Sequence, residues 1–87
     1  MEATLDKLSV ISPARYRITV LGFLDESISD RLGEMAIEYE EPDQKSGNSV
    51  VTLTGWLADQ AALFGVLKTL YNMRRPLISV EYLGAQD

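Results

Sequence analysis

Gly55 lies between a strand-like run and a helix-like run, a position where nucleotide-binding enzymes hold phosphate. The segment from Thr54 to Asp59 reads TGWLAD, whereas a dinucleotide-binding turn needs Gly-x-Gly-x-x-Gly and a P-loop needs two glycines followed by Lys and then Ser or Thr. Asp59 stands where the N-cap of the following helix is expected, so its carboxylate would accept the N–H groups that a phosphate would use. We therefore predict that Asp59 caps the helix and that this turn binds no phosphate.

The side chains that most often carry catalysis are missing, because the sequence contains no histidine and no cysteine. Thiol nucleophiles, His-based triads and zinc sites built on these ligands are thereby excluded. Carboxylates remain, and a group of them gathers at the end of a predicted strand: Glu38, Glu40, Glu41 and Asp43. They could act as an acid and base pair or bind a hard cation, but outward charge also keeps edge strands from pairing, and we favour that interpretation. The sequence thus predicts no catalytic residue, no metal and no cofactor.

Net charge and hydropathy narrow the range of partners. The chain has a net charge of −5 and its 8 Lys and Arg residues are scattered, which disfavours nucleic acid as a partner. The pair Arg74-Arg75 follows a predicted helix, where cations meet the negative end of the helix dipole, so we expect capping rather than ligand binding. No apolar run approaches the roughly 20 residues that cross a bilayer, and the N-terminus opens acidic. We expect a cytoplasmic protein that contacts neither nucleic acid nor membrane.

Residues 1–13 and residues 14–87 differ in pattern. In the first segment Leu5, Leu8 and Ile11 have helical spacing, but the segment is short and ends at Pro13, so we interpret it as an N-terminal arm. A frayed tail and a segment that packs on the body or on a second subunit both fit this arm. Residues 14–87 are interpreted as a single domain, since 87 residues are too few for two cores.

Four strands and two helices are predicted in this domain. Alternating apolar and polar residues predict strands over residues 15–20, 35–41, 50–54 and 77–83. A short helix behind the capping candidates Asp25 and Ser27 ends near Gly33, and a longer helix runs from Asp59 to Asn72. The polar residues 41–50 are expected to form a mobile hairpin loop. With right-handed crossovers this order gives an α+β, ferredoxin-like β-α-β-β-α-β sandwich: a four-stranded antiparallel sheet with two helices on one face.

The predicted core lies between that sheet and the helices. It comprises the inward strand residues Ile18, Val20, Ile37, Val51, Leu53, Ile78 and Val80, and the helix residues Ile28, Leu32, Leu63, Val66, Leu67 and Leu70. Tyr16, Tyr39 and Tyr82 have core-facing parity and are expected to pack rather than to form a stacking surface. The other face of the sheet is left for solvent or a partner.

Two sets of side chains are candidates for an interaction surface. Trp56 is predicted in the turn after the third strand, while Phe64 and Tyr71 lie seven residues apart on the longer helix. These aromatic residues either mark an interface or widen the core-facing stripe. The open face of the sheet would present a shallow polar groove, lined by Arg17, Thr19, Thr52, Thr54, Ser79 and Glu81.

Several short motifs together resemble a group of short, uncharacterised stand-alone bacterial proteins. The motifs are Tyr16-Arg17 with Gly22-x-Leu24-Asp25, Val51-Thr52-x-Thr54-Gly55 leading into Asp59-Gln60-Ala61-Ala62-Leu63-x-Gly65-x-Leu67, and Pro76-Leu77-x-Ser79-Val80-Glu81. The resemblance covers residues 15–83, and the Thr-Gly to Asp-Gln-Ala-Ala-Leu segment is its most specific part. It implies a bacterial cytosolic setting, and it supplies no activity and no catalytic residues.

We therefore expect a small non-enzymatic binding or accessory module that acts through protein–protein contact as a homodimer, with an additional protein partner left open. Association is one way in which small folds gain burial. The arm, the open sheet face or both would form the contact. The alternative is a small-ligand sensor or minor enzyme that uses the open face of the sheet, which fold analogy supports only weakly.

Overall fold

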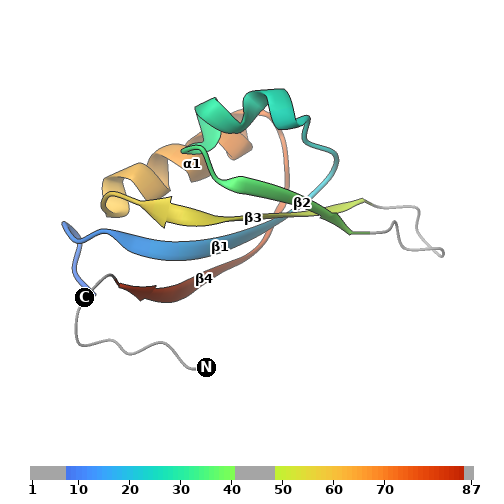
Figure 1. The fold of residues 1–87 in the computed structure, drawn as a ribbon. Helices are drawn as coiled ribbons and strands as arrows, with labels where there is room; N and C mark the ends of the chain where they lie inside the picture. The colour runs from blue at the N-terminus through green and yellow to red at the C-terminus, as the bar shows by residue number, and fades with distance from the viewer. Residues whose placement is uncertain (1–7, 41–48, 86–87) are drawn as a thin grey trace.

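The computed structural model describes residues 8–40 and 49–85 (Figure 1). In chain order the elements are strand β1 (Ala14–Leu21), 3-10 helix η1 (Glu26–Leu32), strands β2 (Ala36–Glu40) and β3 (Val50–Leu57), helix α1 (Gln60–Asn72) and strand β4 (Leu77–Ala85). Most of the predicted hairpin loop lies outside the described residues, as do Leu5 of the arm and the carboxylates of Glu41 and Asp43.

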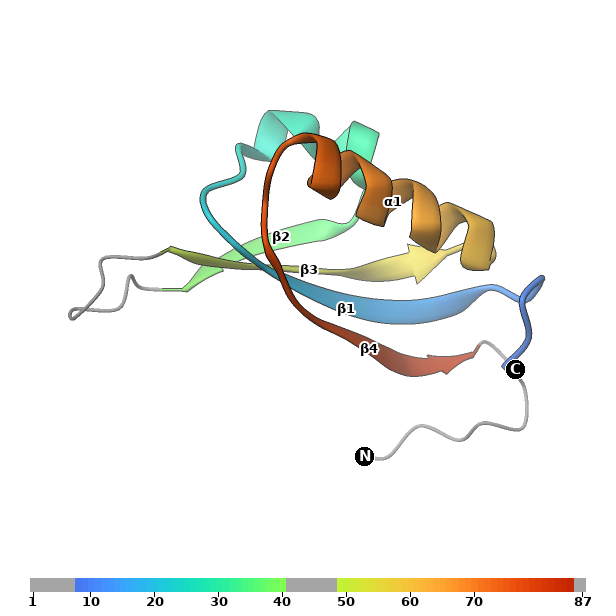
Figure 2. The ribbon, with the colours of Figure 1, turned by 180° about the vertical axis from the view of Figure 1, so that it is seen from behind.

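The described strands form one antiparallel sheet in the order β2-β3-β1-β4, so that β2 and β4 are its edges. Both η1 and α1 lie on the same side of this sheet (Figures 1 and 2). The sequence-based prediction of an α+β fold, with a four-stranded antiparallel sheet and two helices on one face, is confirmed at this level.

One hydrophobic core fills the space between the sheet and the helices. Buried residues alternate along β1, as strand geometry requires, and α1 contributes Leu63, Val66 and Leu70 from one side of the helix. The rest of the core comes from η1 and the segments that flank it (Leu24, Leu32 and Met35) and from β3 (Val51, Leu53 and Leu57). Ile28, Ile37 and Leu67 pack against this core in partly buried positions. The predicted core positions in β1, β3 and α1 are therefore confirmed.

The short helix predicted after β1 is a 3-10 helix. Asp25 is its N-cap, and the Asp25 Oδ1 accepts a hydrogen bond from the N–H of Ser27 at 3.0 Å. Gly33 ends the helix in the left-handed region, with φ 68°. This backbone conformation favours glycine, and a Cβ here would lie 2.8 Å from Cδ2 of Leu57, so that side chain would have to shift. The sequence ESISDRL contains few strong α-helix formers, which favours a short, tight helix held by its caps.

Strand β3 runs beyond Thr54 through Gly55 to Leu57, which corrects two expectations. Gly55 lies within the strand rather than in a turn, and Trp56 is a strand residue opposite Arg15 of β1. A Cβ at Gly55 would lie 3.2 Å from Cα of Met35, so the glycine allows the segment before β2 to approach the strand closely. The space that this glycine leaves is occupied by the protein's own backbone.

Strand β4 is only partly covered by the helices. Register shifts between Arg15 and Tyr16, and between Thr19 and Val20, interrupt its pairing with β1 at both ends. Ile78 falls in one of these shifts and is 54% exposed, and Val80, opposite the buried Ile18, is 38% exposed. The prediction that Ile78 and Val80 belong to the core is wrong, because α1 packs mainly on η1 and β3.

Helix α1 has the predicted boundaries. The Asp59 Oδ1 accepts a hydrogen bond from the N–H of Ala62 at 2.8 Å, which confirms the predicted cap. The N–H of Gln60 donates to the carbonyl of Val10 at 3.0 Å, so the N-terminal segment also satisfies this end of the helix. At the other end, the Nη1 of Arg75 donates to the carbonyl of Met73 at 2.9 Å, so the capping predicted for the basic pair is performed by Arg75.

Candidate interaction surface

Most of the predicted interaction residues share the face of the sheet that points away from the helices. This group comprises Arg17, Thr52, Thr54, Trp56 and Glu81. Arg17 of β1 lies between Thr54 of β3 and Glu81 of β4. Its Nη1 is 3.6 Å from Oε1 of Glu81, and both side chains are about half exposed, so the ion pair contributes little stability. The centre of this face is polar, with charge of both signs.

A ligand groove over this polar face receives no support from the surface geometry. Three hollows on the described part of the chain are lined by other residues, and none of these three by Arg17, Thr52, Thr54 or Glu81. One hollow, of about 330 Å³, lies beside η1 and the start of β2, where Glu26 and Glu34 contribute to its wall. Another, of about 220 Å³, is bordered by Tyr71, Arg74, Arg75 and Pro76.

The remaining predicted residues, Phe64 and Tyr71, belong to a different surface. They are 64% and 79% exposed, and their spacing of seven residues puts them on the same side of α1. Leu77 and Val80 of β4 pair with buried residues of β1, so they face the helix side of the sheet although each is substantially exposed. We call the apolar set Phe64, Leu67, Tyr71, Leu77 and Val80 the α1–β4 surface.

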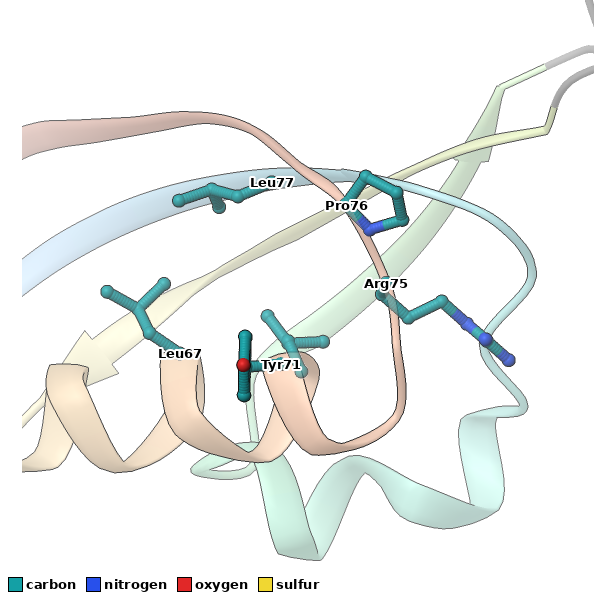
Figure 3. A pocket seen from close by; sticks show the side chains of 6 residues that line it. Leu67, Tyr71, Arg75, Pro76 and Leu77 are labelled. Atoms are coloured by element: carbon teal, nitrogen blue, oxygen red, sulfur yellow. The ribbon is translucent and has the colours of Figure 1, made fainter.

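A hollow of about 280 Å³ lies in the part of the α1–β4 surface where the C-terminal half of α1 meets the start of β4 (Figure 3). Its lining is apolar apart from one arginine and consists of Leu67, Leu70, Tyr71, Arg75, Pro76 and Leu77. The guanidinium of Arg75 extends away from Leu67 and Leu77, and its Nε donates to the carbonyl of Phe23 at 3.0 Å. Because this cation is engaged with backbone carbonyls, the hollow is suited to apolar groups.

The three tyrosines with core-facing parity occupy different environments. Tyr16 is buried and meets Tyr82 edge to face at a centroid distance of 6.0 Å. Neither of these two hydroxyls has a hydrogen-bond partner among the described residues. Tyr39 is 43% exposed, stacks on Phe23 at 5.4 Å and donates its hydroxyl hydrogen to the carbonyl of Leu24. The packing prediction is therefore right for Tyr16 and Tyr82, whereas Tyr39 covers the edge of the core.

The predicted acidic cluster is only partly within the described residues. Glu38 and Glu40 lie exposed on the edge strand β2. Within residues 8–40 and 49–85, no group of three or more acidic side chains is arranged so that it could hold a metal ion. In the same residues, no helix has the length and apolar character needed to cross a membrane.

Sequence reasoning missed the part of the α1–β4 surface that β4 provides. Phe64 and Tyr71 were found from their helical spacing, whereas Val80 was assigned to the core. A signal was nevertheless present, because the segment LISVEYL carries a single charge although it forms an edge strand. Edge strands that stay unpaired usually carry more charge.

Comparison with known protein families matches residues 15–81 to the domain of unknown function DUF8691. No curated protein and no solved structure matches the chain. The matched range begins in β1, ends in β4 and includes η1, β2, β3 and α1 between them. Since the match takes in most of the chain and reaches every described element, the protein belongs to the DUF8691 family.

Proposed function

We propose that the protein is a non-enzymatic binding module that acts through protein–protein contact as a homodimer, with the α1–β4 surface as the contact. The observation that carries this proposal is the gathering of exposed Phe64, Tyr71, Leu77 and Val80 on one side of the molecule, beside an edge strand. Single exposed apolar residues are common on protein surfaces, whereas a contiguous group of them, here with Tyr71 and Leu77 lining a hollow, is typical of interaction sites.

The size of the domain supports self-association. A chain of 87 residues buries a smaller share of its surface than a larger domain does, and a second copy would cover the exposed inner side of β4. Two-fold dimers are also the commonest closed assembly. The α1–β4 surface is a better contact than the open sheet face suggested by the sequence, because that face carries Arg17, Glu81 and two threonines at its centre.

We also infer a ferredoxin-like sandwich in which the 3-10 helix η1 takes the place of the first α-helix. This assignment is supported by the element order and by the antiparallel strand order β2-β3-β1-β4. The resemblance to short stand-alone bacterial proteins supports a bacterial, cytoplasmic setting.

Light scattering at tens of micromolar tests the proposed homodimer. We expect twice the chain mass of 9.7 kDa for the parent protein. The double variant Phe64→Ser with Tyr71→Ser should be largely monomeric, because it removes two exposed aromatic side chains from the contact. The matched control is Trp56→Ser, which removes an exposed aromatic residue from the opposite face and should remain dimeric.

Two outcomes would overturn the proposal in different ways. A monomeric parent at this concentration excludes the homodimer. A dimer that Trp56→Ser dissociates, and that the Phe64 and Tyr71 double variant leaves intact, assigns the contact to the open sheet face. The alternative of a ligand sensor or minor enzyme would gain support if a small molecule bound at that face and shifted the amide resonances of Thr52 and Thr54.

A further inference from the structure

We infer that the two copies join edge to edge, with β4 of each pairing antiparallel to β4 of the other about a two-fold axis at Val80. The inference rests on the homodimer proposed above and specifies its geometry. In this arrangement the two four-stranded sheets form one continuous sheet, and the outer backbone groups of β4 gain hydrogen-bond partners.

Of the two sheet edges, β4 is the one suited to pairing with a copy of itself. The other edge, β2, is short and carries exposed Glu38 and Glu40, and a two-fold pairing of β2 would bring carboxylates of both copies together. β4 is longer and has Glu81 as its one charged residue. That carboxylate is already beside the Arg17 guanidinium at 3.6 Å, which reduces its repulsion of an approaching strand.

The register between the two β4 strands follows from the regular part of β4 and from its single charged residue, Glu81. Ser79 to Tyr82 lie between the two register shifts and pair residue for residue with β1, so an axis of symmetry is best placed at Val80 or Glu81. An axis at Glu81 would set the carboxylates of the two copies directly opposite each other, which is destabilising. An axis at Val80 instead sets Ser79 opposite the partner's Glu81, and Ile78 opposite the partner's Tyr82.

The proposed pairing accounts for the exposed apolar residues on the helix side of β4, because the second copy would cover them. Neighbouring strands lie about 4.8 Å apart, so the partner's β4 would lie directly against the exposed side of Leu77 and Val80. Phe64 and Tyr71 of both copies then border the space above the two β4 strands. The hollow beside Leu77 then lies next to the C-terminal part of the partner's β4, which is apolar.

Single cysteines test the register cleanly, because the protein has no cysteine of its own. Directly opposite residues on antiparallel strands have Cα atoms about 4.5–5.5 Å apart, within the range that a disulfide spans. Val80→Cys should therefore form an intermolecular disulfide under mild oxidation, seen as a dimer on a non-reducing gel. The dimer band should disappear on reduction.

Two matched variants on the same strand control for random collision. Ser79→Cys and Glu81→Cys are each out of register with their own copies, with Cα atoms about 8 Å apart, and should not cross-link alone. Mixed together, these two variants should cross-link to each other, since Ser79 lies opposite the partner's Glu81. Cross-linking of Ser79→Cys alone as efficiently as Val80→Cys would overturn the register.

A charge on the edge tests the pairing independently of disulfide chemistry. Val80→Lys should give a monomer by light scattering, because an inward charge on an edge strand opposes pairing. Ile78 is a more exposed position of the same strand, so Ile78→Lys is the second variant to use if Val80→Lys folds poorly. Ile78→Lys should also be monomeric. If the parent is a dimer, yet Val80→Cys does not cross-link and both lysine variants stay dimeric, pairing through β4 is wrong and the homodimer stands. If the parent is a monomer, both proposals are wrong.

Discussion

At the scale of single residues, the structural role of Asp59 as the N-cap of α1 can be tested by substitution. Asp59→Ala should lower the free energy of unfolding by about 1 kcal/mol in urea denaturation, because the N–H of Ala62 loses its side-chain acceptor. Asp59→Asn retains an acceptor oxygen and should recover most of that loss. Self-association should be unchanged in both variants. An Asp59→Ala protein of unaltered stability that no longer forms dimers would contradict the structural role.

The pKa of the Tyr39 side chain should differ between the folded protein and the unfolded chain. Partial removal from water, and then the negative charges of Glu26 and Asp25, raise the pKa of its phenol above the ordinary value. The folded state therefore holds this proton more tightly than the unfolded chain does. The resulting stability is fully present below the unfolded pKa of about 10, and is lost as the pH rises through the higher folded pKa.

The absorbance of tyrosinate between about pH 9 and pH 12 measures this effect. Subtracting the titration of Tyr39→Phe from that of the parent isolates the phenol of Tyr39, and we expect its midpoint to lie above that of an unfolded tyrosine peptide. In Tyr39→Phe, the part of the loss of stability at alkaline pH that comes from ionisation of Tyr39 should be absent. A midpoint at or below the peptide value would contradict a pKa raised by partial removal from water and by the charges of Glu26 and Asp25.

At the scale of secondary-structure elements, alanine substitutions at two glycines should change stability in opposite directions. Gly55→Ala should destabilise the protein by about 1–3 kcal/mol, because the new methyl group would lie 3.2 Å from the Met35 Cα and that backbone cannot move without disturbing η1 and β2. Gly65 lies in α1 and has no atom within 4 Å of an added Cβ. Gly65→Ala should therefore stabilise the helix by roughly 0.5–1 kcal/mol. Urea denaturation of both variants checks the pair, and equal effects at the two positions would refute the close contact at Gly55.

The same elements show what a sequence can and cannot predict. Alternation in β1 and the cap and stripe of α1 are local patterns, so the burial of Ile18 and Val20 and the helix start at Asp59 were predicted correctly. The exposure of Val80 is not a local property, because it depends on how far α1 extends across the sheet. Gly55 was likewise misassigned to a turn, since its reason is a contact with Met35 from a distant segment. The α1–β4 surface could be predicted only in part for the same reason. Helical spacing is a local pattern and indicated Phe64 and Tyr71, whereas the position of Leu77 beside them depends on how α1 packs on the sheet.

At the scale of the whole molecule, charge and apolar surface act in opposite directions. A net charge of −5 on each copy opposes association through long-range repulsion, which salt screens. The apolar α1–β4 surface favours association at short range and is little affected by moderate salt. An interface centred on Val80, with Glu81 beside Arg17, places few like charges near each other.

The melting temperature should therefore depend on protein concentration. If the dimer unfolds to two separate chains, mass action raises Tm by a few degrees for each tenfold increase in concentration, whereas a monomer shows no such dependence. Scanning calorimetry of the parent from about ten to several hundred micromolar should reveal this rise, and Tm at a given concentration should be higher at higher salt, where repulsion between the acidic copies is screened. Val80→Lys provides the control, with a Tm that is independent of concentration because its edge strand carries a charge. A parent protein whose Tm is also independent of concentration would show that the fold gains nothing from a second copy, and the exposed side of β4 would then have to be explained by a different partner.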